Sequence, residues 1–117
     1  MQELLYLEDD KDLRNAFIEI LSEEFIVRAT SNVQDTIEEI ERKRPEVIIL
    51  DYNLEGTNSL AVIDFLNLRN ISIPIIFFTA KEKNYINKKV SYSNYKGTIT
   101  KPSHNIFEEI NRLLFKN

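Results

Sequence analysis

The chain of 117 residues has no cysteine, one histidine (His104) and only two glycines, Gly56 and Gly97. Without cysteine it can form no disulfide, no thiolate metal site and no cysteine nucleophile. A single histidine excludes any site that needs two or more imidazoles from this chain. The glycine-rich phosphate loops of nucleotide-binding proteins need two or three glycines within about eight residues. The sequence therefore excludes the two common glycine-rich nucleotide-binding motifs, the P-loop and the dinucleotide-binding loop.

The net charge is moderate and acidic. There are 15 basic and 19 acidic residues, which give a formal net charge of −4 at pH 7. Domains that bind nucleic acid usually carry a basic patch, so this balance argues against direct binding of nucleic acid. No apolar run approaches the ~18 residues of a membrane span, and the acidic N-terminus lacks the basic region of a signal peptide. We therefore expect a cytoplasmic protein that contacts neither nucleic acid nor membrane.

Short apolar runs predict the strands of one domain over residues 1–117. Most of the strong runs are almost unbroken, which is typical of parallel strands buried on both faces. Four strong runs and a weaker fifth one cover residues 4–7, 25–27, 47–50, 75–78 and 98–100.

Between these runs the apolar residues recur at helical spacing, as Leu13, Phe17 and Ile20 do after the first run. A less apolar stretch, Lys81–Tyr95, predicts the fourth helix. The sequence also suggests Asn58 as the N-cap of the third helix and a capping box from Asn105 to Glu108 at the fifth. The alternation predicts an α/β fold of the (βα)5 type, with parallel strands joined by right-handed crossovers.

Polar residues follow four of the five predicted strands, at the edge where open α/β sheets bind ligands. Carboxylates are oxygen ligands that select a hard cation, Mg²⁺ before Ca²⁺. A hydroxyl and an ammonium opposite the cation would bind phosphoryl oxygens, and an aspartate in such a cradle can become an acyl phosphate. The polar residues at the predicted strand ends are Glu8, Asp9 and Asp10 after the first run, Asp51 after the third, Thr79 after the fourth and Lys101 after the fifth.

Four segments at these strand ends carry a family resemblance. They read LLYLEDD at 4–10, PEVIILDYNLEG at 45–56, IPIIFFTAK at 73–81 and GTITKP at 97–102. With them, the sequence resembles a response-regulator receiver domain of bacterial two-component signal transduction over essentially the whole chain. The resemblance implies a flavodoxin-like fold with strand order 2-1-3-4-5, the order known for chemotaxis receivers.

The resemblance also implies a role for each site residue, with Mg²⁺ as cofactor and a cis Lys101–Pro102 peptide bond. Asp10 is expected to cap a helix rather than to bind metal. The implied roles are Asp51 as phosphoacceptor, Asp9 as direct metal ligand, Glu8 as a ligand through water, the backbone carbonyl of Asn53 as a further ligand, Thr79 as switch hydroxyl and Lys101 as phosphoryl partner.

The implied function is phosphoacceptor signalling. A histidine kinase or histidine phosphotransfer protein would phosphorylate Asp51, and the domain would then change its surface toward a downstream effector. Such a domain is no enzyme beyond its own phosphorylation and dephosphorylation. A pseudo-receiver that binds partners without phosphate is the alternative. Two enzymes of similar fold fit less well: a D-x-D phosphatase needs an acid at Asn53, and a flavodoxin needs a Ser/Thr/Gly-rich loop at residues 8–11.

The chain departs from the receiver pattern at a few positions away from these site residues. Thr98 stands where an aromatic switch residue is usual, and Glu55 where a proline is usual. Thr98 is too small to act as an aromatic switch. We therefore expect the signal to be relayed by backbone shifts near Thr79 and by a tyrosine of the fourth helix or its exit loop, with Tyr95 as the first candidate.

Overall fold

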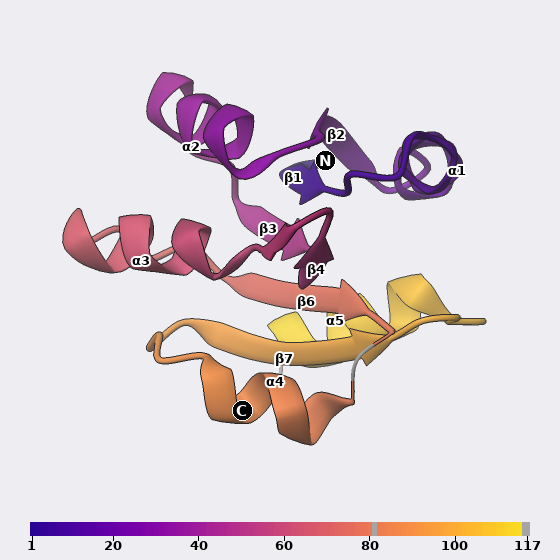
Figure 1. Cartoon of the computed structure of the whole chain (residues 1–117). Coiled ribbons are helices and arrows are strands. Elements are labelled where there is room, and N and C mark those ends of the chain that lie inside the picture. Colours follow the sequence, from indigo (N-terminus) through magenta and orange to yellow (C-terminus); the bar gives the residue numbers. More distant parts are fainter. Residues whose placement is uncertain (81, 116–117) are drawn as a thin grey trace.

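The computed structural model describes residues 1–80 and 82–115 and has a central five-stranded parallel sheet (Figure 1). The strands lie in the order β2-β1-β3-β6-β7. When only the five strands of this sheet are numbered along the chain, the order is 2-1-3-4-5, as predicted. Their bounds are Gln2–Leu7 (β1), Phe25–Thr30 (β2), Val47–Leu50 (β3), Ile75–Thr79 (β6) and Tyr95–Thr100 (β7).

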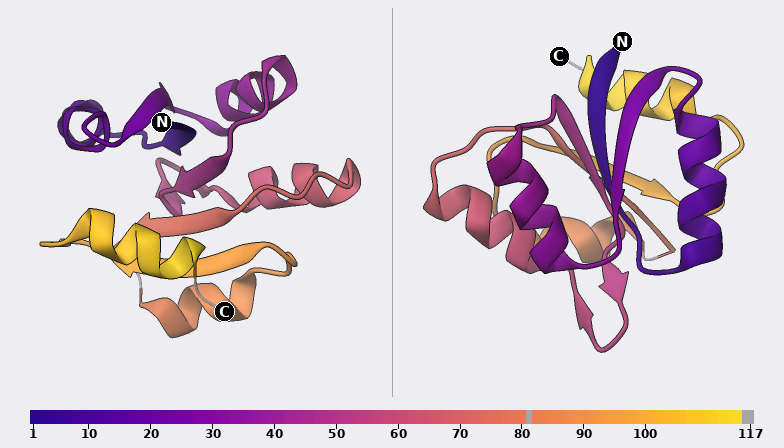
Figure 2. Two further views of the ribbon diagram at one scale, coloured as in Figure 1. Left: turned by 180° about the vertical axis from the view of Figure 1, so that it is seen from behind. Right: turned by 90° about the horizontal axis from the view of Figure 1, so that it is seen from above.

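Helices cover both faces of the sheet (Figure 2). Alternate residues of each central strand enter opposite cores: Leu5 and Leu7 pack with α2, α3 and α4, whereas Leu4 and Tyr6 pack with α1 and α5. This two-sided burial is the reason that β1, β3 and β6 read as unbroken apolar runs. The helices are α1 (Lys11–Leu21), α2 (Val33–Arg42), α3 (Leu60–Leu68), α4 (Lys83–Lys89) and α5 (Ile106–Leu114).

The predicted extent of the fourth helix is wrong. The helix α4 ends at Lys89, because Val90 has an extended backbone (φ −96°, ψ 121°). Tyr95 begins β7, where it pairs with Ile75. The tyrosines that extended the apparent helical pattern have other contacts, since the Tyr92 hydroxyl binds the backbone of the segment before β6. Lys81, the predicted first residue of this helix, lies outside the described residues.

Of the three predicted N-terminal helix caps, the structure confirms one and contradicts the predicted capping contacts of the other two. Asp10 caps α1 as expected, because its Oδ1 accepts a hydrogen bond from the Leu13 N–H at 3.0 Å. The N-cap of α3 is Ser59 and not Asn58, whose Oδ1 accepts from the Leu60 N–H instead. Asn105 is the N-cap of α5, but its side chain makes no capping hydrogen bond, so the predicted capping box is wrong.

A short hairpin that we did not predict follows β3. It consists of β4 (Asn53–Leu54) and β5 (Thr57–Asn58), which pair antiparallel beyond the carboxyl edge of the sheet. Elsewhere at this edge, the Lys101–Pro102 peptide bond is cis, as expected. Among the described residues, no helix is long and apolar enough to cross a membrane.

Candidate functional site

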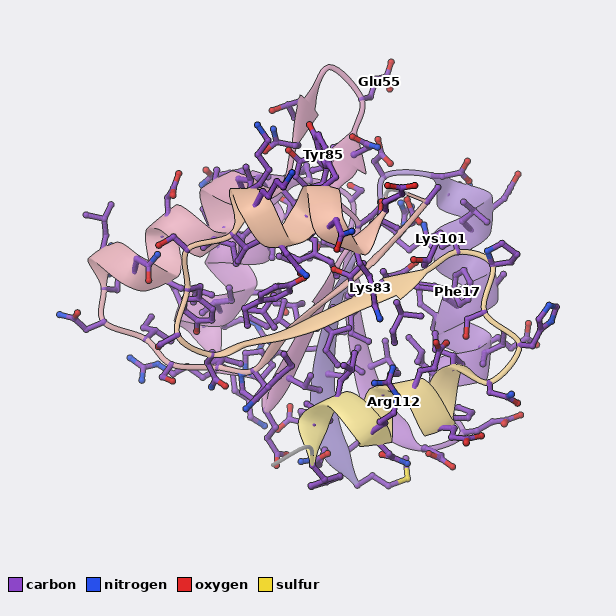
Figure 3. The ribbon with its side chains drawn as sticks, turned by 90° about the horizontal axis from the view of Figure 1, so that it is seen from below. Phe17, Glu55, Lys83, Tyr85, Lys101 and Arg112 are labelled. Carbon is purple, nitrogen blue, oxygen red and sulfur yellow. The ribbon has the colours of Figure 1, made fainter. Side chains whose placement is uncertain are left out.

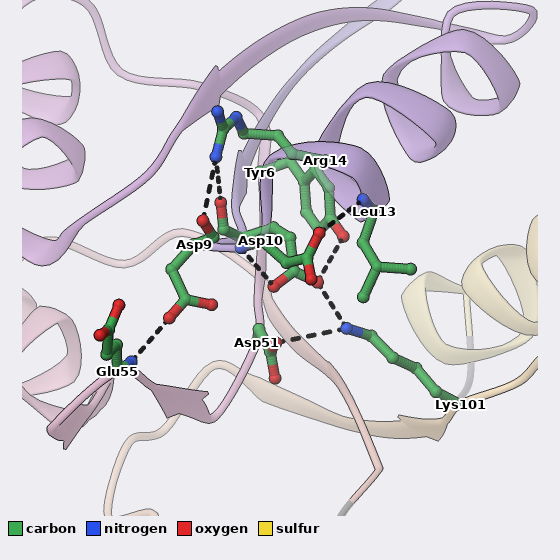
Figure 4. A network of polar contacts seen from close by, with 9 residues as sticks. Tyr6, Asp9, Asp10, Leu13, Arg14, Asp51, Glu55 and Lys101 are labelled. Carbon is green, nitrogen blue, oxygen red and sulfur yellow. Dashed lines mark hydrogen bonds and ion pairs between the residues drawn. The ribbon is translucent and has the colours of Figure 1, made fainter.

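Three carboxylates meet where β1 and β3 end (Figure 4). Glu8 and Asp9 follow β1, and Asp51 follows β3. One carboxylate oxygen from each lies within 4.8 Å of the other two. Glu8 and Asp51 are 1% and 8% exposed, so two of the three charges are largely withdrawn from water.

The sheet itself brings these residues together. Leu7 pairs with Leu50 in parallel register, and the Asp51 N–H donates to the Leu7 carbonyl at 3.0 Å. The first residue after each strand therefore leaves the same edge at the same level. The pairing of β1 with β3 thus makes Asp9 and Asp51 neighbours.

Lys101 supplies the positive charge of the site. Its Nζ lies 2.6 Å from Glu8 Oε1 and 3.3 Å from Asp51 Oδ2. The ammonium also lies 5.2 Å from the centre of the Phe78 ring, a cation–π distance. The Lys101 N–H donates to the Thr79 carbonyl at 2.8 Å, so the ends of β6 and β7 are joined beside the acids. Thr79 itself is buried.

Glu8 is the most buried acid of the cluster. Desolvation raises the pKa of its carboxyl above the ordinary value of 4.5, and the neighbouring Asp51 adds to the rise, whereas the hydrogen bond from Lys101 opposes it. The Tyr6 hydroxyl donates to Glu8 Oε1 at 3.3 Å. Burial, with the adjacent acids, in turn raises the pKa of Tyr6.

Two contacts of the acidic loop could not be inferred from sequence spacing. Arg14, on the first turns of α1, donates from a guanidinium nitrogen to the backbone carbonyls of Glu8 (2.9 Å) and Asp9 (3.4 Å). The Glu55 N–H in the hairpin turn donates to Asp9 Oδ2 at 2.6 Å, so the expectation that position 55 lies away from the site residues is wrong. Both contacts fix the loop that presents Asp9. Asn53 begins β4, two residues beyond Asp51, so its carbonyl follows the same strand end.

The donor set suits a hard divalent cation. Its side-chain donors are all carboxylate oxygens, which Mg²⁺ and Ca²⁺ prefer. Among the described residues, these three carboxylates outnumber the two positive groups beside them, the Lys101 ammonium and the Arg14 guanidinium, so the cluster keeps an excess of negative charge. A divalent cation would balance this excess.

Comparisons with known proteins agree with this arrangement. The family described as "Response regulator receiver domain" matches residues 4–111. None of the curated proteins searched matches the chain. Similar solved structures include a LuxR-family DNA-binding response regulator from Staphylococcus aureus, with 24% identity, a TM-score of 0.83, and coverage of 97% of this chain and 98% of that one.

Two further structures have the same fold at lower identity. The chemotaxis protein CheY4 of Vibrio cholerae has 17% identity and a TM-score of 0.83, with 97% of this chain and 98% of that chain covered. The response regulator TrrA of Thermotoga maritima, in complex with Mg²⁺-BeF, has 18% identity and a TM-score of 0.80, with 97% and 99% covered. From the family match over nearly its whole length, this chain belongs to the response regulator receiver domains.

Proposed function

We propose that the domain accepts a phosphoryl group on Asp51 from a phosphohistidine of a histidine kinase or histidine phosphotransfer protein. The observation that supports this most directly is the environment of the Asp51 carboxylate. It lies at the carboxyl edge of the sheet, 3.3 Å from the Lys101 ammonium and beside the carboxylates of Glu8 and Asp9.

In the proposed reaction an Asp51 carboxylate oxygen attacks the phosphorus of the phosphohistidine. The new O–P bond forms as the P–N bond breaks, and the imidazole leaves the phosphoryl group as the neutral ring after taking up a proton. Lys101 would exchange its contact with Asp51 for one with a phosphoryl oxygen, and the Thr79 hydroxyl would bind another.

Mg²⁺ fits this site as the cofactor. We propose that Asp9, Asp51 and the Asn53 carbonyl would hold it directly, with Glu8 acting through water. The bound cation would neutralise the repulsion between these carboxylates and the oxygens of an incoming phosphoryl group. The Mg²⁺-BeF complex of the similar protein TrrA supports this choice of ion.

We further propose that the signal leaves through β7 and α4 toward a protein effector in the cytoplasm, with no direct contact to nucleic acid. Thr98 is buried and its hydroxyl shares a hydrogen bond of 2.7 Å with the Tyr95 hydroxyl, which also donates to Asn87 Oδ1 at 2.7 Å. This chain of contacts joins the strand that precedes Lys101 to α4. It supports Tyr95 as the relay in a domain without the usual aromatic residue at position 98.

The test is phosphorylation of the purified domain by a small phosphodonor such as acetyl phosphate. With Mg²⁺, one phosphoryl group should be added, and the product should be labile to base and to hydroxylamine, as an acyl phosphate is. Asp51→Asn should abolish the mass increase, and Asp64→Asn should not, because Asp64 is an exposed acid on α3.

Two results would contradict the assignment: a label that persists in Asp51→Asn, or a label that forms without divalent cation. A domain that is never labelled, yet still binds its partner, would be a pseudo-receiver, the alternative function.

A further inference from the structure

The Asp9 carboxylate is held by the backbone of a distant segment. Its Oδ2 accepts a hydrogen bond of 2.6 Å from the N–H of Glu55, 46 positions further along the chain. In Figure 4 the other carboxylate oxygen of Asp9 is turned away from Glu55, to the side on which Asp51 lies. One oxygen of Asp9 is thus occupied by the hairpin, while the second faces the acidic cluster.

The direction of the Glu55 N–H is set by a tight turn. Glu55 and Gly56 are the two residues between Leu54 and Thr57, which pair across the hairpin. Gly56 has φ +73°, and Asn70 is the only non-glycine among the described residues with positive φ, so φ of Glu55 is negative. A negative φ followed by a positive one is the pattern of a type II turn. The N–H is therefore aimed at Asp9 by the backbone, while the Glu55 side chain is exposed at the hairpin tip (Figure 3).

This hydrogen bond opposes a repulsion. Glu8 and Asp51 carry like charges within 4.8 Å of Asp9 and favour an Asp9 side chain that swings outward toward water. A charge-assisted N–H···O⁻ bond is about twice as strong as a neutral one and keeps the carboxylate over the cluster. Partners of this kind orient metal-ligating carboxylates and raise metal affinity.

We propose that Glu55 is a positioning residue of the Mg²⁺ site, through its backbone N–H and not through its carboxylate. The hairpin turn holds Asp9 in the orientation that binds the cation, so the affinity for Mg²⁺ depends on a segment with no ligating side chain of its own. This inference rests on the proposed Mg²⁺ site. The proline that is usual at position 55 in receiver domains has no N–H and could not make this contact.

The turn offers a matched pair of variants. Glu55→Pro removes the N–H, and proline is favoured at this position of a type II turn, so the backbone should keep its course. Glu55→Ala removes the same carboxylate but keeps the N–H. A difference between the two variants therefore reports on the N–H and not on the charge.

The measurement is a calorimetric Mg²⁺ titration of the parent and both variants at equal ionic strength. We expect Glu55→Pro to bind Mg²⁺ about tenfold more weakly than Glu55→Ala, at the low end of the range for such supporting contacts. Equal affinities of the two variants overturn the inference, even if their metal-free melting temperatures differ. Absence of binding by the parent overturns the proposed metal site, and this inference with it.

A spectroscopic measurement on the parent needs no change at position 55. The Glu55 amide proton should resonate at low field, move upfield in Asp9→Ala, and keep its low-field position when Mg²⁺ saturates the parent. If saturation moves this resonance to its position in Asp9→Ala, the bond breaks on metal binding and the inference is wrong.

Discussion

At the scale of single residues, Arg28 is the least exposed of the ion-paired arginines among the described residues. Arg28 of β2 is 15% exposed, donates to Glu39 Oε1 at 2.9 Å and also donates to the Lys43 carbonyl at 2.6 Å. Glu39 binds the Arg42 guanidinium as well. The hydrogen bond from Arg42, together with that from Arg28, lowers the pKa of Glu39 to about 2.

We expect Glu39→Gln to lower the free energy of unfolding by about 1 kcal/mol at pH 7, since the pair is partly exposed. A carboxyl whose pKa is lowered by folding adds stability above its unfolded value, near 4.5, and this contribution is lost as the pH falls toward 2. Urea unfolding of the parent between pH 6 and about 3 should therefore show a decline that is smaller in Glu39→Gln. Glu38→Gln, on the exposed side of α2, is the control. An equal decline in parent and Glu39→Gln would contradict the assignment.

The residues of the site were predictable where the signal is local. Asp51 and Thr79 lie at the ends of buried strands, and the rule that ligands bind at this edge selects them from sequence alone. Arg14, Tyr6 and Glu55 were missed, because each contact depends on how separate elements approach one another. The Glu55 contact uses a backbone N–H, so the only sequence signal for it is that position 55 is not the usual proline.

At the scale of elements, one hydroxyl joins two loops. The Tyr92 hydroxyl accepts from the Ile73 N–H at 2.8 Å and lies 3.0 and 2.9 Å from the carbonyl oxygens of Ile71 and Ile73. It connects the segment before β7 to the segment before β6, and burial raises its pKa. This contact accounts for the early end of α4, since Tyr92 must leave the helical path to reach it.

Tyr92→Phe should cost about 1–3 kcal/mol of unfolding free energy, because it leaves the N–H of the buried Ile73 without its partner. Tyr95→Phe is the matched comparison, since the partners of the Tyr95 hydroxyl among the described residues are the side chains of Asn87 and Thr98. We expect its cost to be about 1 kcal/mol or less. Chemical denaturation gives both values. Equal losses in the two variants would show that the backbone contact of Tyr92 is not the dominant one.

Most helices and strands were predicted, and the ones missed or cut short lack a clear apolar pattern. Strands β1, β3 and β6 are buried on both faces, so their apolar runs are unmistakable. Strand β7 lies at the edge of the sheet and includes Lys96 and Gly97, so only its last residues were recognised. The hairpin β4–β5 has two residues in each strand, which is too short to show an alternation of apolar and polar residues.

At the scale of the whole molecule, charge is divided along the chain. Residues 1–80 have 7 basic and 16 acidic residues, a net charge of −9, whereas residues 81–117 have 8 basic and 3 acidic residues, a net charge of +5. Glu8, Asp9 and Asp51 belong to the acidic part. The summed field of that part adds to the local attraction for a cation and is weakened by salt.

A cation that binds only the folded state must stabilise it. At about ten times a millimolar-range Kd the gain is roughly 1.4 kcal/mol, which corresponds to a rise in Tm of about 4–8 °C for a domain of this size. Scans at low salt, with chelator and with ~10 mM Mg²⁺, measure this rise. Asp9→Asn should remove most of it.

Asn is the appropriate replacement for Asp9, because its Oδ1 can still accept from the Glu55 N–H. The change deletes a charge beside Glu8 and Asp51, so we expect the metal-free variant to be at least as stable as the parent. The proposed metal site is wrong if Mg²⁺ leaves the Tm of the parent unchanged. If Asp9→Asn keeps the full rise, the cation binds elsewhere. If the metal-free variant is instead less stable than the metal-free parent, the three carboxylates at the ends of β1 and β3 do not destabilise the fold by repulsion.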